Sequence, residues 1–349
     1  MSRPVNPPPG GVPPGGDGGE TASAWRSRRA LVTGATGLLG SWVVAALQAR
    51  GAQVVALVRD TVPGSHLWEA ADRTRLVVVR AALDDLEALV RAINEYEVDT
   101  VFHLAAQTLV PVANREPLST FESNIRGTYH VLDACRRSPS VRAVLVASSD
   151  KAYGEQDQLP YTEDAPLLAR HPYDASKACA DILSLTYAAT YDLPVCVTRC
   201  GNLYGPGDLN WSRLVPGTIR SLLWGERPLI RSDGSLVRDY FYVEDAAEAY
   251  LRLAEHVLEG TARGEAFNFS NDEPLSVLDM VARITAAVGV EIEPEVLGHS
   301  PGEIRHQFLS SAKARARLGW QPRHSIEEGL AATVAWYRAR PDLVGAPRG

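Results

Sequence analysis

The chain has 349 residues, and its 35 basic against 42 acidic side chains give a formal net charge of −7 at pH 7. This balance excludes a protein that binds nucleic acid or an anionic membrane through its overall charge. No stretch approaches the ~20 consecutive apolar residues of a membrane span, and the sequence does not begin with a secretory signal. We therefore expect a cytoplasmic enzyme with neither a nucleic-acid nor a membrane partner.

The basic side chains are divided unevenly between arginine and lysine. Lysine occurs only at positions 151, 177 and 313, against 32 arginines. Arginine keeps its proton at working pH, whereas a lysine ammonium can gain or lose one in a suitable environment. The few lysines are therefore candidates for proton transfer. The four cysteines have neither metal-ligand nor disulfide-framework spacing, so we expect reduced thiols and no metal site.

The chain divides into a tail, a sheet domain and a second lobe. Residues 1–24 are rich in proline and glycine, which predicts a disordered tail. Over residues 25–200 short apolar strands alternate with amphipathic helices, the pattern of a doubly wound parallel α/β sheet. In chain order the predicted elements are a strand over 30–33, a helix over 38–50, strands over 53–58 and 76–79, a helix over 84–94, a strand over 100–104, a helix over 117–137, a strand over 143–147, a helix over 173–191 and a strand over 195–198.

Beyond residue 200 the alternation weakens. Prolines, tryptophans and arginines gather in segments such as residues 209–220 (LNWSRLVPGTIR) and 225–245. We predict that residues 201–340 form mainly a smaller substrate-binding lobe, with some return to the sheet domain. Ligands of a doubly wound sheet bind beyond the carboxyl ends of its strands, so the functional residues should lie at those ends.

A glycine-rich turn follows the first predicted strand. Its sequence, Thr33-Gly-Ala-Thr-Gly-Leu-Leu-Gly40, places glycines where a strand-to-helix turn must be tight and where the backbone must approach a pyrophosphate. The amino end of the following helix would supply N–H groups to that anion. We therefore predict a dinucleotide site, with cofactor contacts from Gly34, Thr36, Gly37, Leu38 and Leu39.

The end of the second strand bears on the choice of cofactor. Val58 stands where an acidic residue would bind the ribose hydroxyls of NAD, and Arg59-Asp60 follow it. Arg59 could pair with the additional phosphate of NADP, whereas Asp60 could serve the NAD ribose or simply be solvated. The sequence thus predicts NAD or NADP, with a slight preference for NADP.

A Tyr-x-x-x-Lys motif opens the helix predicted over 173–191. Tyr173 and Lys177 lie one turn apart on the same helix face, so the ammonium can sit near the phenol and lower its pKa. That would make Tyr173 a proton-transfer group near neutrality. The residues Ser148-Ser149-Asp150-Lys151 come after the strand predicted over 143–147, so they should reach the same end of the sheet.

Together these motifs resemble the extended short-chain dehydrogenase/reductase family over about residues 28–338. The resemblance rests on the glycine turn, His103-Leu104-Ala105-Ala106, Ser149, the Tyr173 motif, and residues 199–206 (RCGNLYGP) and 238–245 (RDYFYVED). It implies a Rossmann-type fold, a homodimer formed through the helices near residues 117–137 and 173–191, and a cofactor that is tightly bound and recycled. It also implies catalytic roles for Ser149, Tyr173 and Lys177, and cofactor contacts from Leu104, Ala105, Ala106, Asn124, Tyr173 and Lys177, with Asn124 supporting the lysine through water. Ala82 replaces the usual aspartate near the adenine, although Asp85 is present.

The dipeptide Asp150-Lys151 distinguishes branches of this family. It resembles the pair found in nucleotide-sugar 4,6-dehydratases, and most closely that of the CDP-glucose enzymes, whereas 4-epimerases usually carry small or apolar residues there. The implied reaction oxidises carbon 4 of a nucleotide hexose, eliminates water across carbons 5 and 6, and returns the hydride to carbon 6. Asp150 would protonate the departing hydroxyl and Lys151 would take the carbon 5 proton. An exposed Asp-Lys pair on a loop is the structural alternative.

The implied substrate is a nucleotide-diphosphate hexose. By resemblance its contacts come from Gln107, Asn202, Leu214, Val215, Arg238 and Arg305, with arginine suited to bidentate phosphate binding. The segment after Tyr153 is shorter than expected for a CDP-glucose dehydratase, so the base and the sugar stay open. A 4-epimerase or keto-sugar reductase on the same scaffold is the alternative, and an inactive NAD(P)-sensing protein is a more remote one.

Overall fold

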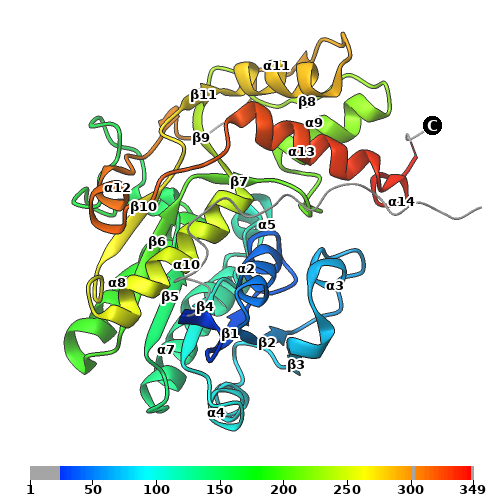
Figure 1. The fold of residues 1–349 in the computed structure, drawn as a ribbon. Helices are drawn as coiled ribbons and strands as arrows, with labels where there is room; N and C mark the ends of the chain where they lie inside the picture. Colours follow the sequence, from blue (N-terminus) through cyan, green and yellow to red (C-terminus); the bar gives the residue numbers. More distant parts are fainter. Residues whose placement is uncertain (1–23, 300–302, 347–349) are drawn as a thin grey trace, which may run out of the picture.

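The computed structural model describes residues 24–299 and 303–346, so all but the last residue of the predicted tail lies outside the described residues. Its central feature is a seven-stranded sheet in the order β10-β6-β5-β4-β1-β2-β3, with every neighbouring pair parallel (Figure 1). This confirms the predicted doubly wound α/β class. The strands are β1 (Arg29–Thr33), β2 (Gln53–Val58), β3 (Leu76–Arg80), β4 (Thr100–His103), β5 (Ala143–Ala147), β6 (Val195–Cys200) and β10 (Ala266–Phe269).

Helices cover both faces of the sheet because its buried strands alternate their side chains between two apolar cores. Ala30 and Val32 belong to the core beneath α2 and α10, while Leu31 between them belongs to the core beneath α4, α7 and α8. Among the described residues no helix is long and apolar enough to cross a membrane. The helices of the two faces are α2 (Leu38–Ala49), α3 (Leu67–Ala70) and α10 (Val243–Glu259), and α4 (Leu86–Glu95), α7 (Gly127–Arg136) and α8 (Pro172–Tyr191).

The helix predicted over 117–137 is present over residues 117–136, with a π turn inside it that the sequence did not predict. It consists of α6 (Pro117–Phe121), the π-helical turn η2 (Glu122–Arg126) and α7. A short α5 (Val110–Arg115), which the sequence analysis missed, precedes it. Glu116, with a φ of −134°, separates α5 from α6 because proline disfavours α conformation in the residue before it. The π turn carries Asn124, and single π turns are frequent at functional sites.

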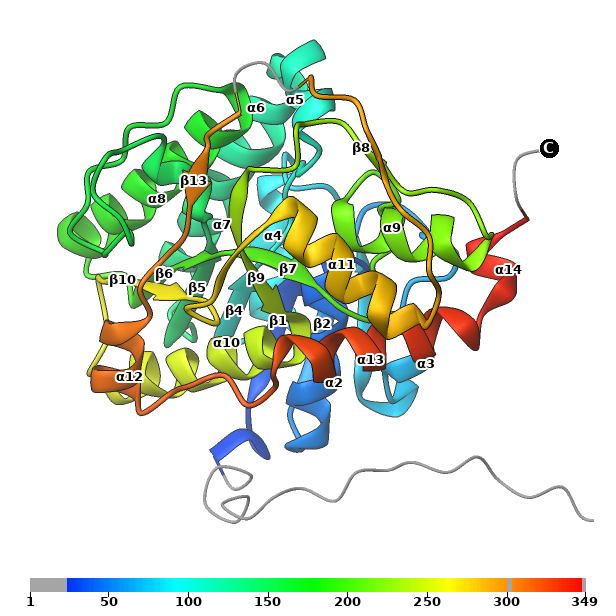
Figure 2. The same cartoon turned by 90° about the horizontal axis from the view of Figure 1, so that it is seen from above.

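The chain after β6 builds a second group of elements and twice returns to the main sheet. The helix α10 packs on α2 and β10 becomes the edge strand beside β6, with α12 against it, while most of the other elements gather beyond the carboxyl ends of the strands (Figures 1 and 2). A small sheet there pairs β9 with β7, β11 and β13, and β8 pairs with β12. These elements are β7 (Asn202–Tyr204), α9 (Leu214–Leu223), β8 (Leu229–Ile230), β9 (Val237–Tyr242), β11 (Pro274–Ser276), α11 (Val277–Val288), β12 (Glu295–Val296), β13 (His306–Gln307), α12 (Ala312–Leu318), α13 (Ile326–Arg338) and α14 (Pro341–Val344).

The strand order reverses between β4 and β1, which lie side by side in the middle of the sheet. The loops that leave the carboxyl ends of two such strands diverge to opposite faces and leave a crevice between them. The glycine turn after β1 and the loop after β4 therefore both border the expected ligand position.

Candidate active site

The glycine turn is shaped as a dinucleotide site requires. Gly34 has a φ of +70°, and a Cβ built on it would lie 2.7 Å from the backbone nitrogen of Ala105. A Cβ on Gly40 would lie 2.1 Å from the Gly34 carbonyl oxygen. Gly37 caps α2 without any side-chain hydrogen bond, so the first amides of the helix stay available to an anion. The residues of this turn therefore fit the pyrophosphate of NAD or NADP.

The loop after β4 is held against that turn by a buried hydroxyl. Thr33 Oγ1 accepts hydrogen bonds from the backbone nitrogens of Leu104 at 3.1 Å and Ala105 at 3.2 Å, and it contacts His103 Nδ1 at 2.9 Å. Burial, aided by the Lys177 charge, lowers the pKa of His103 to about 3, so this imidazole stays neutral. The backbone of residues 104–106 is thereby fixed beside the predicted cofactor position.

The residues proposed for the adenosine end have other partners in the structure. Arg59 Nε lies 2.6 Å from Asp60 Oδ2, and the two side chains are 70% and 65% exposed. Asp85 caps α4, since its carboxylate accepts a hydrogen bond from the Ala88 backbone nitrogen at 2.9 Å. It is therefore occupied as a helix cap and does not replace the aspartate that is missing at Ala82.

Tyr173 and Lys177 are both buried in the first turns of α8. Burial raises the pKa of Tyr173 to about 12, which is opposite to the lowering that we expected from Lys177. The ammonium is directed elsewhere, because Lys177 Nζ donates to the Ala147 carbonyl at 2.7 Å. Burial lowers the pKa of Lys177 to about 8. Both groups thus lie in an environment that penalises charge, and a cation bound nearby would change the pKa of both.

Ser149, Asp150 and Lys151 enter the same region through a short 3-10 helix, η3 (Asp150–Tyr153). Ser149 Oγ donates to Asp150 Oδ1 at 2.9 Å, and Ser149 also acts on Tyr173 as a hydrogen-bond partner that lowers the pKa of the phenol. Asp150 is 1% exposed, and burial raises its pKa. Asp150 Oδ2 has no hydrogen-bond partner within the part of the chain that the structure describes. The alternative of an exposed Asp-Lys loop is therefore wrong for Asp150.

Asn124 lies beneath this group but does not contact Lys177. Its Oδ1 accepts from the Gln107 backbone nitrogen at 2.7 Å, and its Nδ2 donates to Ser176 Oγ at 2.9 Å. Ser176 in turn donates to the Tyr173 carbonyl at 2.7 Å. The direct contacts of Asn124 thus connect the loop after β4 to the start of α8. The side-chain amide of Gln107 turns toward Thr120, at 3.2 Å.

The small sheet carries two of the residues predicted to bind substrate, and a third, Arg305, lies directly before β13. Asn202 on β7 pairs with Tyr240 on β9, and Arg238 on β9 pairs with Gln307 on β13. Arg238 is 6% exposed, its charge acts on the pKa of Asp150, and its Nη2 lies 3.3 Å from Glu303 Oε2. The side chain of Arg305 is exposed, although its carbonyl accepts a hydrogen bond from the Val237 nitrogen at 2.8 Å.

Leu214 and Val215 begin α9, directly after Arg213. The Arg213 guanidinium lies 3.2 Å from Asp208 Oδ2 and 3.3 Å from Thr108 Oγ1, and its charge acts on the pKa of Tyr173. The amino end of α9 therefore faces the active-site region. The sequence analysis did not single out Arg213.

Two further residues at this site were also missed. Gln307 is fully buried, and its Oε1 accepts a hydrogen bond from Lys151 Nζ at 3.2 Å. Asp239 is fully buried beside Arg238 on β9, and burial, with a smaller contribution from the Asp150 charge, raises the pKa of Asp239 to about 7. Both positions depend on the pairing of β9 with β13. A strand of two residues has no periodicity from which that pairing could be predicted.

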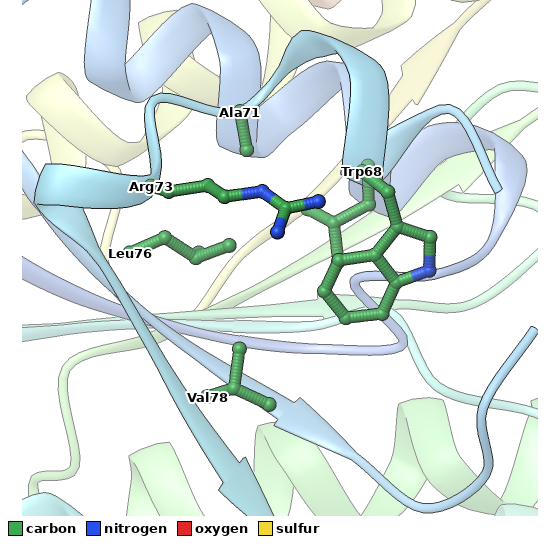
Figure 3. Close-up of a pocket in the computed structure, with 6 residues that line it drawn as sticks. Trp68, Ala71, Arg73, Leu76 and Val78 are labelled. Atoms are coloured by element: carbon green, nitrogen blue, oxygen red, sulfur yellow. The ribbon is translucent and has the colours of Figure 1, made fainter.

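A hollow elsewhere on the surface is not lined by carboxyl, phenol or lysine groups. It lies between α3 and the beginning of β3 and is lined by apolar side chains and one guanidinium (Figure 3). Leu76 in its wall pairs with Val54 near the start of β2, so the hollow lies toward the amino ends of the strands. The crevice beyond their carboxyl ends, with its buried carboxyl, phenol and ammonium groups, is the candidate active site.

Comparisons with known proteins show the family of the chain. A family model described as the NAD dependent epimerase/dehydratase family matches residues 30–269. The chain is 29% identical to CDP-glucose 4,6-dehydratase of Salmonella typhimurium, covering 90% of this chain and 92% of that protein. It is 32% identical to UDP-glucose 4-epimerase of Mycolicibacterium smegmatis, covering 89% and 98%. A solved dTDP-glucose 4,6-dehydratase of Streptomyces venezuelae, with NAD and TYD bound, matches with a TM-score of 0.81 at 29% identity, covering 90% and 98%.

Proposed function

The chain belongs to the NAD dependent epimerase/dehydratase family, as its motifs predicted, and we propose that it is a nucleotide-sugar 4,6-dehydratase. Its product would be a nucleotide-linked 4-keto-6-deoxyhexose. The observation that carries the proposal is the pair Asp150 and Lys151 beside Tyr173. Asp150 is buried, has a raised pKa and keeps one carboxyl oxygen unpartnered among the described residues, as an acid for a departing hydroxyl requires.

The proposed chemistry divides the proton transfers among three side chains, with Lys177 in support. Tyr173 removes the proton of the carbon 4 hydroxyl, and Lys177 lowers the cost of the phenolate once a cationic nicotinamide is also present. NAD or NADP, held by the glycine turn, would supply the hydride acceptor for carbon 4 and the hydride donor for carbon 6. Lys151 takes the acidic carbon 5 proton and later returns it, while Asp150 protonates the hydroxyl that leaves carbon 6.

The proton balance gives Ser149 a further role in this scheme. Each turnover leaves a proton on Tyr173 and removes one from Asp150, so the two groups must be reset before the next cycle. Ser149 donates to Asp150 Oδ1 at 2.9 Å and also acts on Tyr173. We propose that its hydroxyl carries the proton from the phenol to the carboxylate.

The substrate would lie between the sheet ends and the small sheet. Arg238 and Arg305 are proposed to bind the diphosphate, with Asn202 and Gln107 beside it and Leu214 and Val215 against the base. The ion pair between Arg238 and Glu303, with Glu303 55% exposed, supports this, because a diphosphate can replace a solvated carboxylate. The similarity to a CDP-glucose dehydratase makes CDP-glucose the first substrate to test.

The test is incubation of the purified protein with CDP-, dTDP-, UDP- and GDP-hexoses, followed by NMR of the products. A 4-keto-6-deoxy sugar formed without net cofactor consumption is the expected result. A sugar epimerised at carbon 4 would instead support the second candidate, a 4-epimerase, which the similarity to the Mycolicibacterium smegmatis enzyme favours. Stoichiometric consumption of reduced cofactor would identify a reductase.

We also propose that the cofactor is NAD or NADP, held tightly and recycled, with Arg59 favouring NADP. Arg59 forms an ion pair with Asp60 at the end of β2. The additional phosphate of NADP would compete with the Asp60 carboxylate for this guanidinium, which supports a contact between Arg59 and that phosphate. In titration calorimetry, Arg59→Ala should weaken NADP binding about tenfold and leave NAD binding nearly unchanged, because only NADP loses a charged contact. Equal changes for both cofactors would contradict this role.

A homodimer is proposed through α6, α7 and α8. Large apolar side chains on these helices are exposed: Leu118 by 64%, Ile182 by 56%, Tyr191 by 53% and Tyr129 by 38%. Such a set on neighbouring helices is typical of a covered surface. Light scattering after size-exclusion chromatography should give twice the 37.8 kDa mass of one chain. A monomer at micromolar concentration would contradict the proposal.

A further inference from the structure

Gln307 joins the small sheet to the helical turn that carries Lys151. It lies opposite Arg238 in the pairing of β13 with β9, and 156 residues separate it from Lys151. The side chain is fully buried, and its Oε1 accepts a hydrogen bond from Lys151 Nζ at 3.2 Å. The other end of the amide, Nε2, is buried without a hydrogen-bond partner among the residues that the structure describes.

A second buried glutamine shows how a purely structural amide behaves in this protein. Gln48 uses both ends, since Oε1 accepts from the Asp72 nitrogen at 2.8 Å and Nε2 donates to the Asp72 carbonyl at 3.0 Å. Gln307 instead commits only its acceptor, and commits it to a lysine ammonium. Burying an unpaired amide N–H group is costly, which makes Gln307 a poor choice if packing were its only role.

We propose that Gln307 is the positioning residue for Lys151, and that its amide oxygen aims the lysine amine at the carbon 5 proton of the sugar. This inference rests on the proposed dehydratase function. A lysine side chain has four rotatable carbons and a compact charge, so it needs an acceptor to define its direction. An uncharged amine that donates an N–H to Gln307 Oε1 keeps its lone pair turned away from the amide and free to take a proton.

The uncharged acceptor also suits a group that must alternate between two charge states. When Lys151 takes the proton from carbon 5, the ammonium keeps its hydrogen bond to Gln307, and the electron pair of the broken C–H bond stays with the sugar. The proton returns to carbon 5 later, so the step consumes nothing else. A carboxylate at position 307 would bind the charged form more tightly and hinder its return to the amine.

The first experiment uses the holoenzyme and the substrate identified by the product test. Gln307→Met keeps the length of the side chain but has no oxygen acceptor, Gln307→Glu keeps an acceptor with a charge, and Gln48→Met is the matched control. In heavy water, both Gln307 variants should incorporate deuterium at carbon 5 about tenfold more slowly, the usual scale for a hydrogen bond to a charged group. Transient cofactor reduction and KM should be nearly unchanged, and Gln48→Met should retain the wild-type exchange rate.

The second experiment does not need turnover. Because the chain has three lysines, brief acylation followed by mass spectrometry reports Lys151, Lys177 and Lys313 on separate peptides. Only an uncharged amine reacts, and an amide acceptor stabilises the charged form. The rate at Lys151 relative to Lys313 should therefore rise about threefold in Gln307→Met and fall by a similar factor in Gln307→Glu. Because the labelling ratio should change in opposite directions in the two variants, either variant alone tests the contact if the other fails to fold.

The outcomes separate this inference from the proposed function. An unchanged labelling ratio at Lys151 in a folded Gln307 variant would overturn the contact, and changed labelling with wild-type deuterium exchange would overturn its positioning role. A wild-type protein that forms no 4-keto-6-deoxy sugar would overturn the dehydratase and with it the carbon 5 role of Gln307. The labelling ratio would then still decide whether the amide holds the lysine.

Discussion

The coenzyme region and the elimination region of this active site are built in different ways. We define the coenzyme region as residues 33–40 and 103–107, and the elimination region as residues 149–151 with Arg238, Asp239 and Gln307. In the coenzyme region, the residue type at each position is set by the local backbone: Gly34 has a φ of +70° and lies against Ala105. In the second, Lys151 meets Gln307 across 156 residues of sequence. Local steric demands leave a sequence motif, whereas a contact between distant segments need not leave one.

The largest expected effect comes from substitution of Lys151, which should impair the elimination region and leave the coenzyme region working. Lys151→Ala removes the proposed base, which typically contributes about 10²- to 10⁴-fold, so formation of the deoxy sugar should fall by about that factor. Oxidation at carbon 4 depends on Tyr173, so transient reduction of the cofactor should persist. Deuterium uptake at carbon 5, followed by NMR, measures the effect. Full exchange in this variant would contradict the assignment.

The chain offers a matched control for that substitution. Lys313 donates to the Ala266 carbonyl at 2.9 Å and pairs with Glu265 at 2.9 Å, so its ammonium is engaged at the start of β10. We assign it no part in the chemistry. Lys313→Ala should leave both cofactor reduction and deuterium uptake at their wild-type rates.

The next effect tests the coenzyme region alone. Gly34→Ala places a Cβ 2.7 Å from the Ala105 nitrogen in a left-handed conformation, so the turn must shift away from the pyrophosphate position. We expect the dissociation constant of the cofactor to rise at least about tenfold in titration calorimetry. Gly225→Ala is the control, since Gly225 has a φ of +74° and nothing within 4 Å of the added carbon. Equal losses of cofactor affinity in both variants would mean that backbone strain, and not the contact with Ala105, causes the weaker binding.

The last effect is on stability rather than on activity or binding, and it concerns the elimination region. Burial, with smaller contributions from Asp150 and Asp272, raises the pKa of Asp239 to about 7. A carboxyl whose pKa is raised by folding binds its proton more tightly in the native state. Its stabilising contribution is therefore complete below the unfolded value near 4 and is lost as the pH rises to 7.

Asp239→Asn removes this dependence. The variant should be more stable than the wild type by about 4 kcal/mol at pH 8, since each unit of pKa shift corresponds to about 1.4 kcal/mol, with the advantage shrinking toward pH 4. Urea unfolding at pH 4, 6 and 8 measures it. Asp233→Asn provides the reverse case, because hydrogen bonds from Ser235 lower the pKa of Asp233. The stability that Asp233 contributes should be lost as the pH falls. An Asp239→Asn advantage that is equal at every pH would contradict the sign.

The family resemblance put forward Ser149, Asp150 and Lys151 as candidate catalytic residues. The residues by themselves predicted the parallel sheet, the glycine turn and the placement of Tyr173 and Lys177 on one helix face. These follow from short-range rules: alternating apolar residues define strands, a tight turn requires glycine, and a four-residue spacing places two side chains on one helix face. The family followed from the same motifs, and the match over residues 30–269 confirms it.

Only the tertiary structure decided what surrounds those groups. It placed a π turn inside the helix expected over 117–137 and raised the pKa of Tyr173 against the expected effect of Lys177. It also brought Gln307 to Lys151 through the pairing of β13 with β9. Desolvation and partner choice depend on what packs around a group from every side. A motif of five residues specifies which ionisable side chain is present but does not specify the residues that pack around it.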